Sequence, residues 1–370
     1  MSSDSTAADT APAGPSPKIT CIAVTYPLPP SALTTVRSRF PTVHFYPHPS
    51  PIPSSVLPDI QVLYTSNRGI APETGVASFD QMPKLRHIQM VSAGADKAAN
   101  QSIMATAAER GVTLGSASGI HVLSIPPWVV GMAVGVWQQF PRMMQIQRNE
   151  QRWADGTEVE QSSQELYYAR SLRGRTAGML GYGALGRESA RLLKAMGMKI
   201  IACNTSGKQT PQDGYIIPGT GDPTGSLPSS FYSTRDSTSL DAFLSECDLL
   251  VASLPGTQGT RYLLDAAKLG LMKDEAVFVN VGRGSLIKSE ELLKALDSPR
   301  LFGAALDVTD PEPLPTGQPL WSHPKCIITP HLSGDTEGQF DIATDILLEN
   351  VRRMEAGEGL VNLIDIKRGY

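Results

Sequence analysis

The chain has 370 residues, of which 41% are hydrophobic and 18% charged, and its formal net charge is -4 at pH 7. This length is more than one hydrophobic core usually takes, so we expect two domains in a globular protein of ordinary composition. The charge balance gives no general attraction to nucleic acid or to an anionic membrane, and we expect neither as a partner.

The cysteines and the N-terminal residues indicate a compartment. The four cysteines form neither a C-x-x-C pair nor a Cys/His cluster with metal spacing, so we expect reduced thiols and no bound metal. Residues 1–17 lack the basic start and apolar core of a secretory signal, and we expect a disordered tail there. The longest apolar run, 128–137, is too short to span a bilayer. A cytoplasmic protein is therefore expected.

From Lys18 onwards, short apolar runs alternate with helix-like stretches. This alternation is typical of a parallel sheet covered on both faces. The expected strands lie at 18–26, 43–47, 60–66, 85–94 and 112–118, and the expected helices at 29–40 and 102–111.

A long helix is expected from Ser124 to about Arg148. The stretch is apolar nearly all round, so it must be buried in a domain or against a partner. Pro126 and Pro127 suit its first turn, where a missing N–H costs little.

The alternation restarts near Ala177 with six strand candidates, the strand count of a complete dinucleotide-binding domain. Between Gly207 and Pro228 lie five glycines and four prolines, so 207–240 is expected to be a long irregular loop, functional or mobile. The expected strands lie at 177–180, 198–203, 247–254, 276–281, 301–308 and 326–330, and the expected helices at 184–197, 260–272 and 289–298.

The first of these strands runs into a G-x-G-x-x-G motif at Gly181, Gly183 and Gly186. A lone motif of this kind is weak evidence, but here a strand precedes it and an amphipathic helix follows. The first glycine permits a tight turn, the second lets a pyrophosphate approach the backbone, and the third lets the helix pack closely on the sheet. The phosphates would lie at the helix N-terminus, so the stretch predicts a dinucleotide site.

The next strand ends at Asn204, where a protein selective for NAD would carry an acidic residue. Asparagine does not repel a 2′-phosphate, and Ser206 and Lys208 follow closely enough to contact one. Asn204 could equally bind a ribose hydroxyl, with Lys208 a solvated loop charge. Both NADP and NAD therefore stay open as the cofactor, with NADP slightly preferred.

Arg283, Glu312 and His331 each follow one of the last three strands. Ligands of an open parallel sheet bind outside the carboxyl ends of its strands, so these residues can converge beside the glycine loop. Arg283 can clamp a carboxylate and polarise the adjacent carbonyl, His331 can exchange a proton near neutral pH, and Glu312 can orient the imidazole. A nicotinamide nearby would supply a hydride.

These motifs resemble those of the D-isomer-specific 2-hydroxyacid dehydrogenases, which include glyoxylate/hydroxypyruvate reductases, D-lactate dehydrogenases and 3-phosphoglycerate dehydrogenases. The resemblance covers nearly everything from about Asp59 to the C-terminus. The long loop and the "KRGY" ending resemble a fungal-type branch. The segment 172–198 is similar to the family's cofactor signature, 271–287 to its arginine motif, 305–315 to its glutamate motif and 329–331 to its histidine motif.

The resemblance implies an α/β fold with two doubly wound parallel-sheet (Rossmann-like) domains, the substrate domain being discontinuous. Residues 18–121 and 335–370 would form the substrate domain, and 122–334 the dinucleotide-binding domain. The resemblance also implies a homodimer built largely on the apolar helix at 124–148.

The resemblance assigns roles to individual residues. It implies that Arg283, Glu312 and His331 are the catalytic triad. The implied substrate site consists of Ser66, Asn67, Ala93, Gly94 and Arg283, with backbone N–H groups around Gly94 holding the substrate carboxylate. The residues expected to bind the cofactor are Gly181, Tyr182, Gly183, Ala184, Leu185, Gly186, Asn204, Thr205, Ser206, Lys208, Leu254, Pro255, Thr257, Val281, Gly282, Asp307 and His331.

We therefore expect an NAD(P)H-dependent oxidoreductase that interconverts a small 2-oxoacid, such as glyoxylate or hydroxypyruvate, and its D-2-hydroxy acid. The alternative is an NAD(H)-sensing, corepressor-like binding protein of the same fold with little turnover. A formate-type dehydrogenase is disfavoured, because that branch carries glutamine where this chain has Glu312.

Overall fold

The computed structural model describes residues 17–160 and 166–366, which form two compact units. The first unit contains the chain up to Ser118 and again from Gly338, and the second runs from Gly119 to Glu337. The division expected from the sequence differs from these limits by a few residues. The expected disordered tail at 1–17 lies outside the described residues, apart from Pro17.

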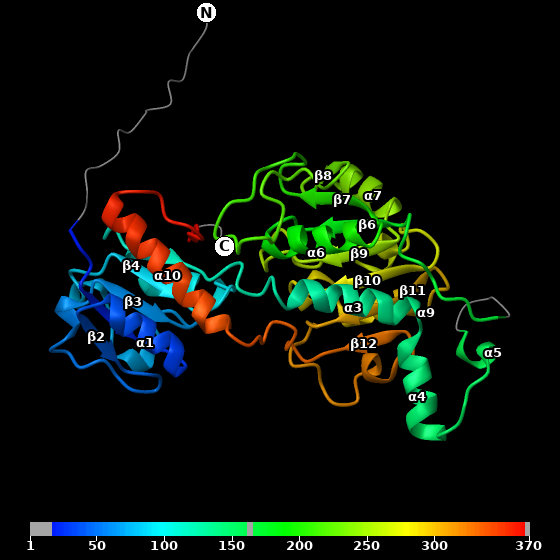
Figure 1. Ribbon diagram of the computed structural model, residues 1–370, viewed down its shortest axis with the longest axis horizontal. Coiled ribbons are helices and arrows are strands. Elements are labelled where there is room, and N and C mark those ends of the chain that lie inside the picture. Colours follow the sequence, from blue (N-terminus) through cyan, green and yellow to red (C-terminus); the bar gives the residue numbers. More distant parts are fainter. Residues whose placement is uncertain (1–16, 161–165, 367–370) are drawn as a thin grey trace, which may run out of the picture. The chain divides into compact units, whose positions relative to one another are not determined.

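The first unit is built on a five-stranded sheet in which all neighbouring strands pair in parallel, in the order β2-β1-β3-β4-β5. Helices α1 and α10 lie side by side against it (Figure 1). The strands are β1 (Cys21–Val24), β2 (Thr42–Phe45), β3 (Val62–Thr65), β4 (His87–Met90) and β5 (Thr113–Gly115). The helices are α1 (Pro30–Arg39), α2 (Asp96–Ala99) and α10 (Gln339–Ala356), with 3₁₀ turns at Leu57–Asp59, Pro72–Thr74, Phe79–Gln81 and Ser102–Thr106.

The second unit contains a seven-stranded parallel sheet in the order β12-β11-β10-β9-β6-β7-β8. Its strands are β6 (Thr176–Leu180), β7 (Lys199–Asn204), β8 (Phe231–Ser233), β9 (Leu249–Ala252), β10 (Ala276–Asn280), β11 (Leu301–Leu306) and β12 (Cys326–Ile328). Its helices are α3 (Ile125–Trp137), α4 (Phe140–Glu150), α5 (Gly156–Val159), α6 (Ala184–Ala195), α7 (Ser237–Ser245), α8 (Ala266–Leu269) and α9 (Ser289–Asp297), with 3₁₀ turns at Gly284–Leu286 and Pro319–Ser322.

Both faces of this second sheet are covered, as the continuous apolar strands require. Successive strand side chains point to opposite faces. One face packs against α3 and α6, and the other against α7, α8 and α9. The first face includes Ala177, Met179, Leu249, Val251, Val277 and Val279, and the second includes Leu180, Leu250, Ala252 and Phe278. The prediction of two doubly wound parallel-sheet units is confirmed.

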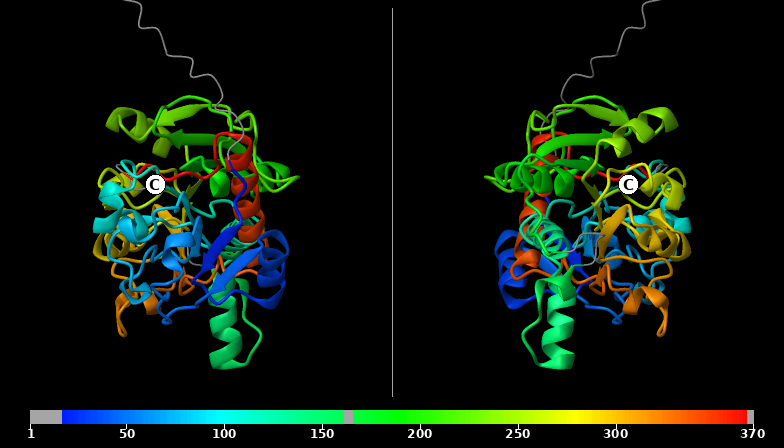
Figure 2. Two further views of the ribbon diagram at one scale, coloured as in Figure 1. Left: turned by 90° about the vertical axis from the view of Figure 1, so that its left-hand side faces the viewer. Right: turned by 90° about the vertical axis from the view of Figure 1, so that its right-hand side faces the viewer.

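Four expected elements differ from the structure. The helix expected from Ser124 to Arg148 is broken at Gln139, which adopts φ 54, so that α3 and α4 are separate. Figures 1 and 2 show α4 projecting from the rest of the second unit. The helix expected at 102–111 is a 3₁₀ turn, and only Ala266–Leu269 is helical within 260–272. The expected loop at 207–240 contains β8, which makes a seventh strand, and the first residues of α7.

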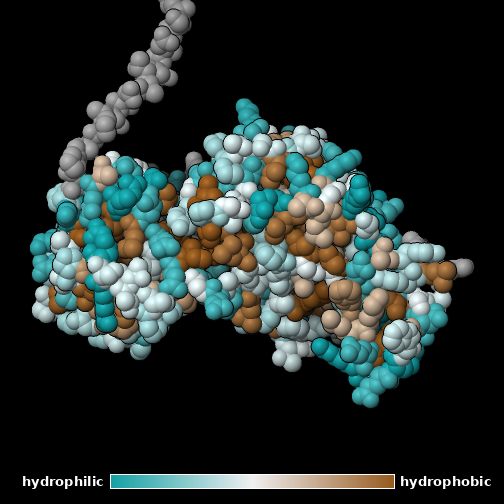
Figure 3. Space-filling view, viewed as in Figure 1, coloured by the Kyte–Doolittle hydropathy of each residue, from teal (hydrophilic) through white to brown (hydrophobic). Residues whose placement is uncertain are grey.

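Apolar surface remains on the second unit. Figure 3 shows hydrophobic side chains gathered over α3, where Trp128, Val130 and Met132 are only partly buried. On α4, Phe140 and Met144 are exposed. Over the ranges that the structure describes, no helix is long and apolar enough to cross a membrane.

Candidate active site

The carboxyl ends of the second unit's strands carry a row of loops that touch one another. Ser253, after β9, donates a hydrogen bond of 3.2 Å from its hydroxyl to the carbonyl oxygen of Gly181, after β6. A Cβ on Gly282, after β10, would lie 2.7 Å from the carbonyl oxygen of Leu254. A Cβ on Gly284 would overlap Thr309, after β11. Small residues therefore let the predicted cofactor loop and the predicted arginine loop lie along one edge.

The three glycines of the motif have distinct surroundings. Gly181 adopts φ 100, a left-handed conformation that favours glycine. A Cβ on Gly186 would lie 2.2 Å from the carbonyl oxygen of Gly181, so this helix position has no room for a side chain. A Cβ on Gly183 would meet nothing within 4 Å. The backbone is thus open at Gly183, where a ligand would approach, and closed at Gly186, where the helix meets the turn.

Helix α6 begins directly after Gly183, and no side chain among the described residues caps its N-terminus. Ala184 and Leu185 form its first positions. The N–H groups of a first helical turn have no partner within the helix, and the helix dipole adds positive potential there. This end of α6 can hold a phosphate group.

Asn204 uses its side chain to shape the turn after β7. Its Oδ1 accepts hydrogen bonds from the backbone N–H of Ser206 and Gly207, at 3.1 and 2.7 Å, and from the Ser206 hydroxyl at 3.1 Å. Its Nδ2 donates to the carbonyl oxygen of Lys208 at 2.9 Å. The Ser233 hydroxyl fixes the same turn by donating to the carbonyl oxygen of Thr205. Within residues 17–160 and 166–366, one amide N–H of Asn204 has no partner and could bind a ligand.

Arg283 stands at the tip of the turn after β10. The turn is held by buried Asn280, whose Oδ1 accepts from the N–H of Gly282 at 3.1 Å and whose Nδ2 donates to the carbonyl oxygen of Arg283 at 3.1 Å. The Arg283 guanidinium donates to the carbonyl oxygen of Gly282 at 2.9 Å. The side chain of Asn280 therefore fixes the backbone that carries the Arg283 guanidinium.

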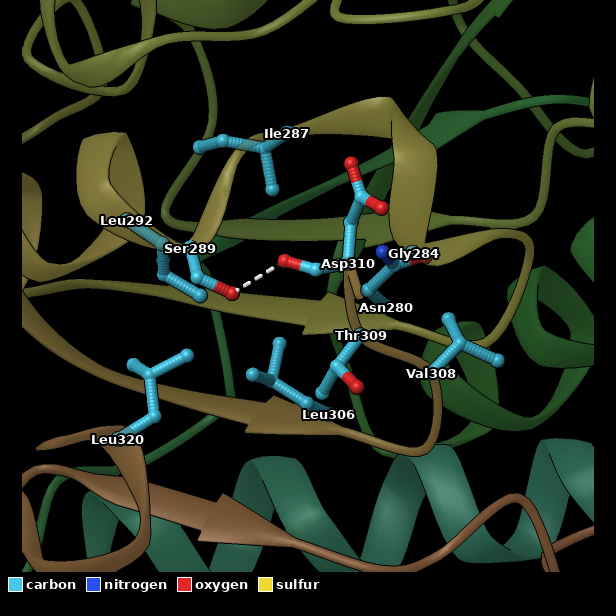
Figure 4. Close-up of a pocket in the computed structure, with 10 residues that line it drawn as sticks. All are labelled: Asn280, Gly284, Ile287, Ser289, Leu292, Leu306, Val308, Thr309, Asp310 and Leu320. Atoms are coloured by element: carbon cyan, nitrogen blue, oxygen red, sulfur yellow. Dashed lines mark hydrogen bonds between the residues drawn. The ribbon is translucent and has the colours of Figure 1, made fainter. Parts of the chain in front are cut away.

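Beside this turn lies a small pocket with room for about one water molecule (Figure 4). Its lining is mostly apolar, and two of the lining residues are joined by a 2.6 Å hydrogen bond from the Ser289 hydroxyl to the carbonyl oxygen of Asp310. The ten residues that line it are Asn280, Gly284, Ile287, Ser289, Leu292, Leu306, Val308, Thr309, Asp310 and Leu320. None of the predicted site residues is among them, so this pocket is not the predicted site.

His331 and Glu312 form a close pair. The Nδ1 atom of His331 lies 2.6 Å from Oε1 of Glu312, and 53% and 41% of the two side chains are exposed. The carboxylate can therefore hold a proton on Nδ1 and leave Nε2 to exchange a proton with a substrate. The expected pairing of these two residues is present in the structure.

Asp307 organises the segment that carries His331. Its carboxylate accepts hydrogen bonds from the Thr329 hydroxyl, from the N–H of Leu332 at 3.1 Å, and from the N–H and hydroxyl of Ser333. Its carbonyl oxygen accepts from the N–H of His331 at 2.9 Å. Asp307 was expected to bind the cofactor, and its role in fixing this segment was not anticipated.

The expected substrate residues outside Arg283 lie in the first unit. Ser66 and Asn67 directly follow β3, and Ala93 and Gly94 follow its neighbour β4, so the two loops start from adjacent strand ends. The carbonyl oxygen of Gly94 accepts a hydrogen bond from the Ser92 hydroxyl at 3.3 Å. All four residues are partly exposed.

Arg68, in the same loop, is held by its neighbours. Its guanidinium lies 2.8 Å from Nε2 of His48 and 2.6 Å from Oε1 of Glu73. Sequence reasoning could not anticipate this cluster, because His48 lies in a different loop.

The structure also brings Arg235 to the adenosine end of the predicted cofactor site. Strand β8 pairs with β7 so that Ser233 is opposite Asn204, and Arg235 follows two positions later. Local sequence around Asn204 gives no sign of this arginine, because the long loop separates the two residues. A strand assignment at 231–233 is the signal that would have revealed it.

The remaining predicted cofactor residues lie along the same edge. Leu254, Pro255 and Thr257 follow β9, and Val281 follows β10. The carbonyl oxygen of Pro255 accepts a 2.7 Å hydrogen bond from the Thr260 hydroxyl, which fixes the loop after β9. In the part of the chain that the structure describes, no three His, Cys, Asp or Glu residues are grouped to hold a metal ion.

Comparison with known proteins gives concordant matches. Residues 130–218 and 222–333 match the family model described as the D-isomer specific 2-hydroxyacid dehydrogenase, NAD binding domain. The "Uncharacterized protein in proB 3′ region" of Corynebacterium melassecola is 31% identical over 303 residues, which cover 82% of this chain and 88% of that protein.

Two further proteins have assigned activities. The glyoxylate/hydroxypyruvate reductase A of Photorhabdus laumondii is 34% identical over 193 residues, about half of each chain (52% and 55%). The crystal structure of the NADPH-dependent glyoxylate/hydroxypyruvate reductase of Sinorhizobium meliloti, in complex with NADP and sulfate, superposes with a TM-score of 0.69. It is 24% identical, and the match covers 95% of this chain and 100% of that one.

Proposed function

This chain belongs to the D-isomer-specific 2-hydroxyacid dehydrogenase family and is an NAD(P)-dependent oxidoreductase, and on that premise we propose that it reduces glyoxylate, hydroxypyruvate or a 2-oxoacid of similar size to the D-2-hydroxy acid. The observation that carries the proposal is the His331–Glu312 pair, which stands on the strand edge that also bears the glycine loop and Arg283.

The residues of the second unit fit a nicotinamide dinucleotide. Gly183 is open to a ligand, and the uncapped N-terminus of α6 offers N–H groups to a pyrophosphate. Leu254, Pro255, Thr257, Val281 and Gly282 would line the nicotinamide end. Asn204, Thr205, Ser206 and Lys208 would line the adenosine end. When bound, the cofactor supplies the hydride for carbonyl reduction.

Each member of the triad then has one task. Arg283 binds the substrate carboxylate through two parallel N–H bonds and polarises the adjacent carbonyl. His331 gives its Nε2 proton to the carbonyl oxygen as that oxygen gains negative charge. Glu312 keeps the proton on Nδ1 and stabilises the charged imidazole before the transfer.

Substrate recognition in the first unit is part of the same proposal. Backbone N–H groups at Ala93 and Gly94 would bind the substrate carboxylate, and Ser66 and Asn67 would contact the substrate side chain. A small substrate is favoured because the named relative from Photorhabdus laumondii is a glyoxylate/hydroxypyruvate reductase.

The preference for NADP is supported by charge. The turn after β7 carries no carboxylate that would repel a 2′-phosphate, and Lys208 and Arg235 both stand beside it. The Sinorhizobium meliloti structure contains NADP, so the fold accommodates the phosphorylated cofactor.

Three finer expectations remain proposals. The homodimer would use the apolar surface of α3 and α4. The cytoplasm is favoured by four cysteines that are all free thiols. The fungal-type branch rests on the long loop and the C-terminal residues. The alternative of a dinucleotide-sensing binding protein has no support in the comparisons.

The test is a matched set of initial rates. NADPH and NADH oxidation would be followed with glyoxylate, hydroxypyruvate, pyruvate, phenylpyruvate and 2-ketoisocaproate. We expect the highest kcat/KM with glyoxylate or hydroxypyruvate and with NADPH. A preference for NADH would leave the proposed reductase activity standing, but it would overturn the argument from charge that the protein prefers NADP. If none of the five acids is reduced although the protein binds a dinucleotide, the result would favour the sensing protein.

A further inference from the structure

The long Gly/Pro-rich loop between β7 and β8 is fastened to the helix that follows the cofactor loop. The fastening point is Arg187, in the first turn of α6, whose side chain is only 2% exposed. Its Nη2 donates to the carbonyl oxygens of Thr210 and Pro211 at 2.9 and 3.2 Å, and its Nη1 donates to the carbonyl oxygen of Asp222 at 2.8 Å. The Arg187 guanidinium thus binds the loop at two places, near its start at residues 210–211 and near its end at Asp222.

The same guanidinium also holds the cofactor loop. Its Nε donates to the carbonyl oxygen of Tyr182 at 2.9 Å, and its central carbon lies 4.7 Å from the centre of the Tyr182 ring. Tyr182 is the residue between the first two glycines of the motif. Arg187 therefore links the backbone that would face a pyrophosphate to a loop about 30 positions later in the chain.

A second connection runs through the tyrosine side chain. The Tyr182 hydroxyl donates a 2.8 Å hydrogen bond to Oδ2 of Asp222, and the same carboxylate accepts from the N–H groups of Ser226 and Leu227 at 3.1 and 2.9 Å. Tyr182 is 5% exposed and Asp222 is 4% exposed. The ring also packs edge-on against Phe231, with 5.8 Å between ring centres.

This burial decides how Tyr182 acts. Its side chain is directed into the protein, so the contact with a cofactor expected from the sequence could be made only by its backbone. A hydrogen bond to a buried carboxylate is stronger than one between neutral groups, and both partners lose their water. The conformation of Tyr182 is therefore tied to the position of Asp222.

We propose that Arg187, Tyr182 and Asp222 form a clasp that fixes the cofactor loop in the conformation that binds the dinucleotide. Tyr182 and Asp222 are positioning residues in this clasp, since their side chains act on affinity through the backbone of the glycine motif. The long loop is then a fixed support of the cofactor site and not a lid. The inference rests on the proposed dinucleotide site.

The test removes one hydroxyl group. Tyr182→Phe keeps the ring and its packing and loses only the hydrogen bond to Asp222. Binding of NADPH and NADH would be measured by nicotinamide fluorescence, and binding of ADP-ribose by calorimetry. We expect the Kd of all three ligands to rise about three- to tenfold. The KM for NADPH should rise together with its Kd, because the substitution acts on the loop that would bind the cofactor.

Tyr232→Phe is the matched control. Tyr232 lies on β8 and donates from its hydroxyl to Glu246, an exposed pair of the same chemistry away from the glycine motif. Its removal should leave the three Kd values unchanged. The Tyr182→Phe effect should also shrink in an Asp222→Ala background, because the partner is already gone.

The outcomes separate this inference from the proposed function. Unchanged Kd values in Tyr182→Phe, with a lower melting temperature, would make the clasp purely structural and overturn the inference. If Tyr182→Phe does not fold, Asp222→Asn is measured in the same way and decides the question. A wild-type protein that binds no dinucleotide would contradict the proposed site itself, and the clasp with it.

Discussion

His331 has a left-handed backbone, with φ 56, which is rare for a residue with a side chain. The hydrogen bonds from Leu332 and Ser333 to the Asp307 carboxylate hold the chain in this conformation. Strain of this kind persists only where neighbouring contacts enforce it. The position of the imidazole beside Glu312 is thus set by Asp307, one strand away.

Substitutions of the second and third glycines of the motif are expected to have opposite effects on stability. Gly186→Ala would place a Cβ 2.2 Å from the carbonyl oxygen of Gly181, so we expect a loss of stability of about 1–3 kcal/mol and a large loss of NADPH binding. Gly183→Ala meets open space and has an ordinary φ of -85, so its melting temperature should match the wild type. Its methyl group would still obstruct a pyrophosphate and weaken binding. Thermal melts and fluorescence titrations check both variants, and equal stabilities of the two would contradict the geometry.

At the scale of elements, a buried polar network ties α10 to the first sheet. Gln89 on β4 accepts at its Oε1 from Asn350 of α10 at 2.9 Å, and lies 3.1 Å from Nε2 of His87. The other ring nitrogen of His87 lies 2.8 Å from the hydroxyl of Thr113 on β5. Burial lowers the pKa of His87 from 6.5 to about 4, because the charged imidazole cannot be hydrated there.

This network predicts a pH dependence of stability. Above pH 6.5 the imidazole is neutral in both states, and as the pH falls towards 4 only the unfolded chain binds the proton. The folded state should therefore lose up to about 3 kcal/mol over this range. Urea unfolding of the wild type and of His87→Phe, from pH 7.5 to 4.5, would test this. The difference in the free energy of unfolding between wild type and His87→Phe should become smaller as the pH falls. A difference that does not change with pH would contradict the prediction.

Some elements could be read from local sequence and others could not. Most strands of both sheets are continuous apolar runs between turn residues, so they could be placed from local sequence. The break at Gln139 is marked by Pro141 in the first turn of α4, but the long apolar pattern on both sides of it favoured one continuous helix. Strand β8 is too short to show a period. The tight turn at Gly181, the close packing at Gly186 and the His331–Glu312 pair were predictable. The hydrogen bonds of Asp307 to Leu332 and Ser333, and of Tyr182 to Asp222, were not, because tertiary contacts decide them.

At the scale of the whole molecule, the apolar surface of α3 and α4 predicts self-association. Phe140 and Met144 are 43% and 48% exposed on α4, and Trp128, Val130 and Met132 on α3 are only partly buried. We expect light scattering after size-exclusion chromatography to give twice the chain mass. Met144→Asp should give a monomer, whereas Leu271→Asp, at a similarly exposed site of the second unit, should not. A wild-type monomer at micromolar concentration would contradict the dimer.

The most direct test of the account is the turnover of His331→Ala with the best 2-oxoacid at saturating NADPH, beside the wild type and His323→Ala. His323 is a second histidine of the same unit, 3.4 Å from Asp297 and outside the predicted site. We predict a kcat lowered by about 100- to 10,000-fold in His331→Ala, with His323→Ala at the wild-type rate. Wild-type turnover by His331→Ala would contradict the assignment of the catalytic acid.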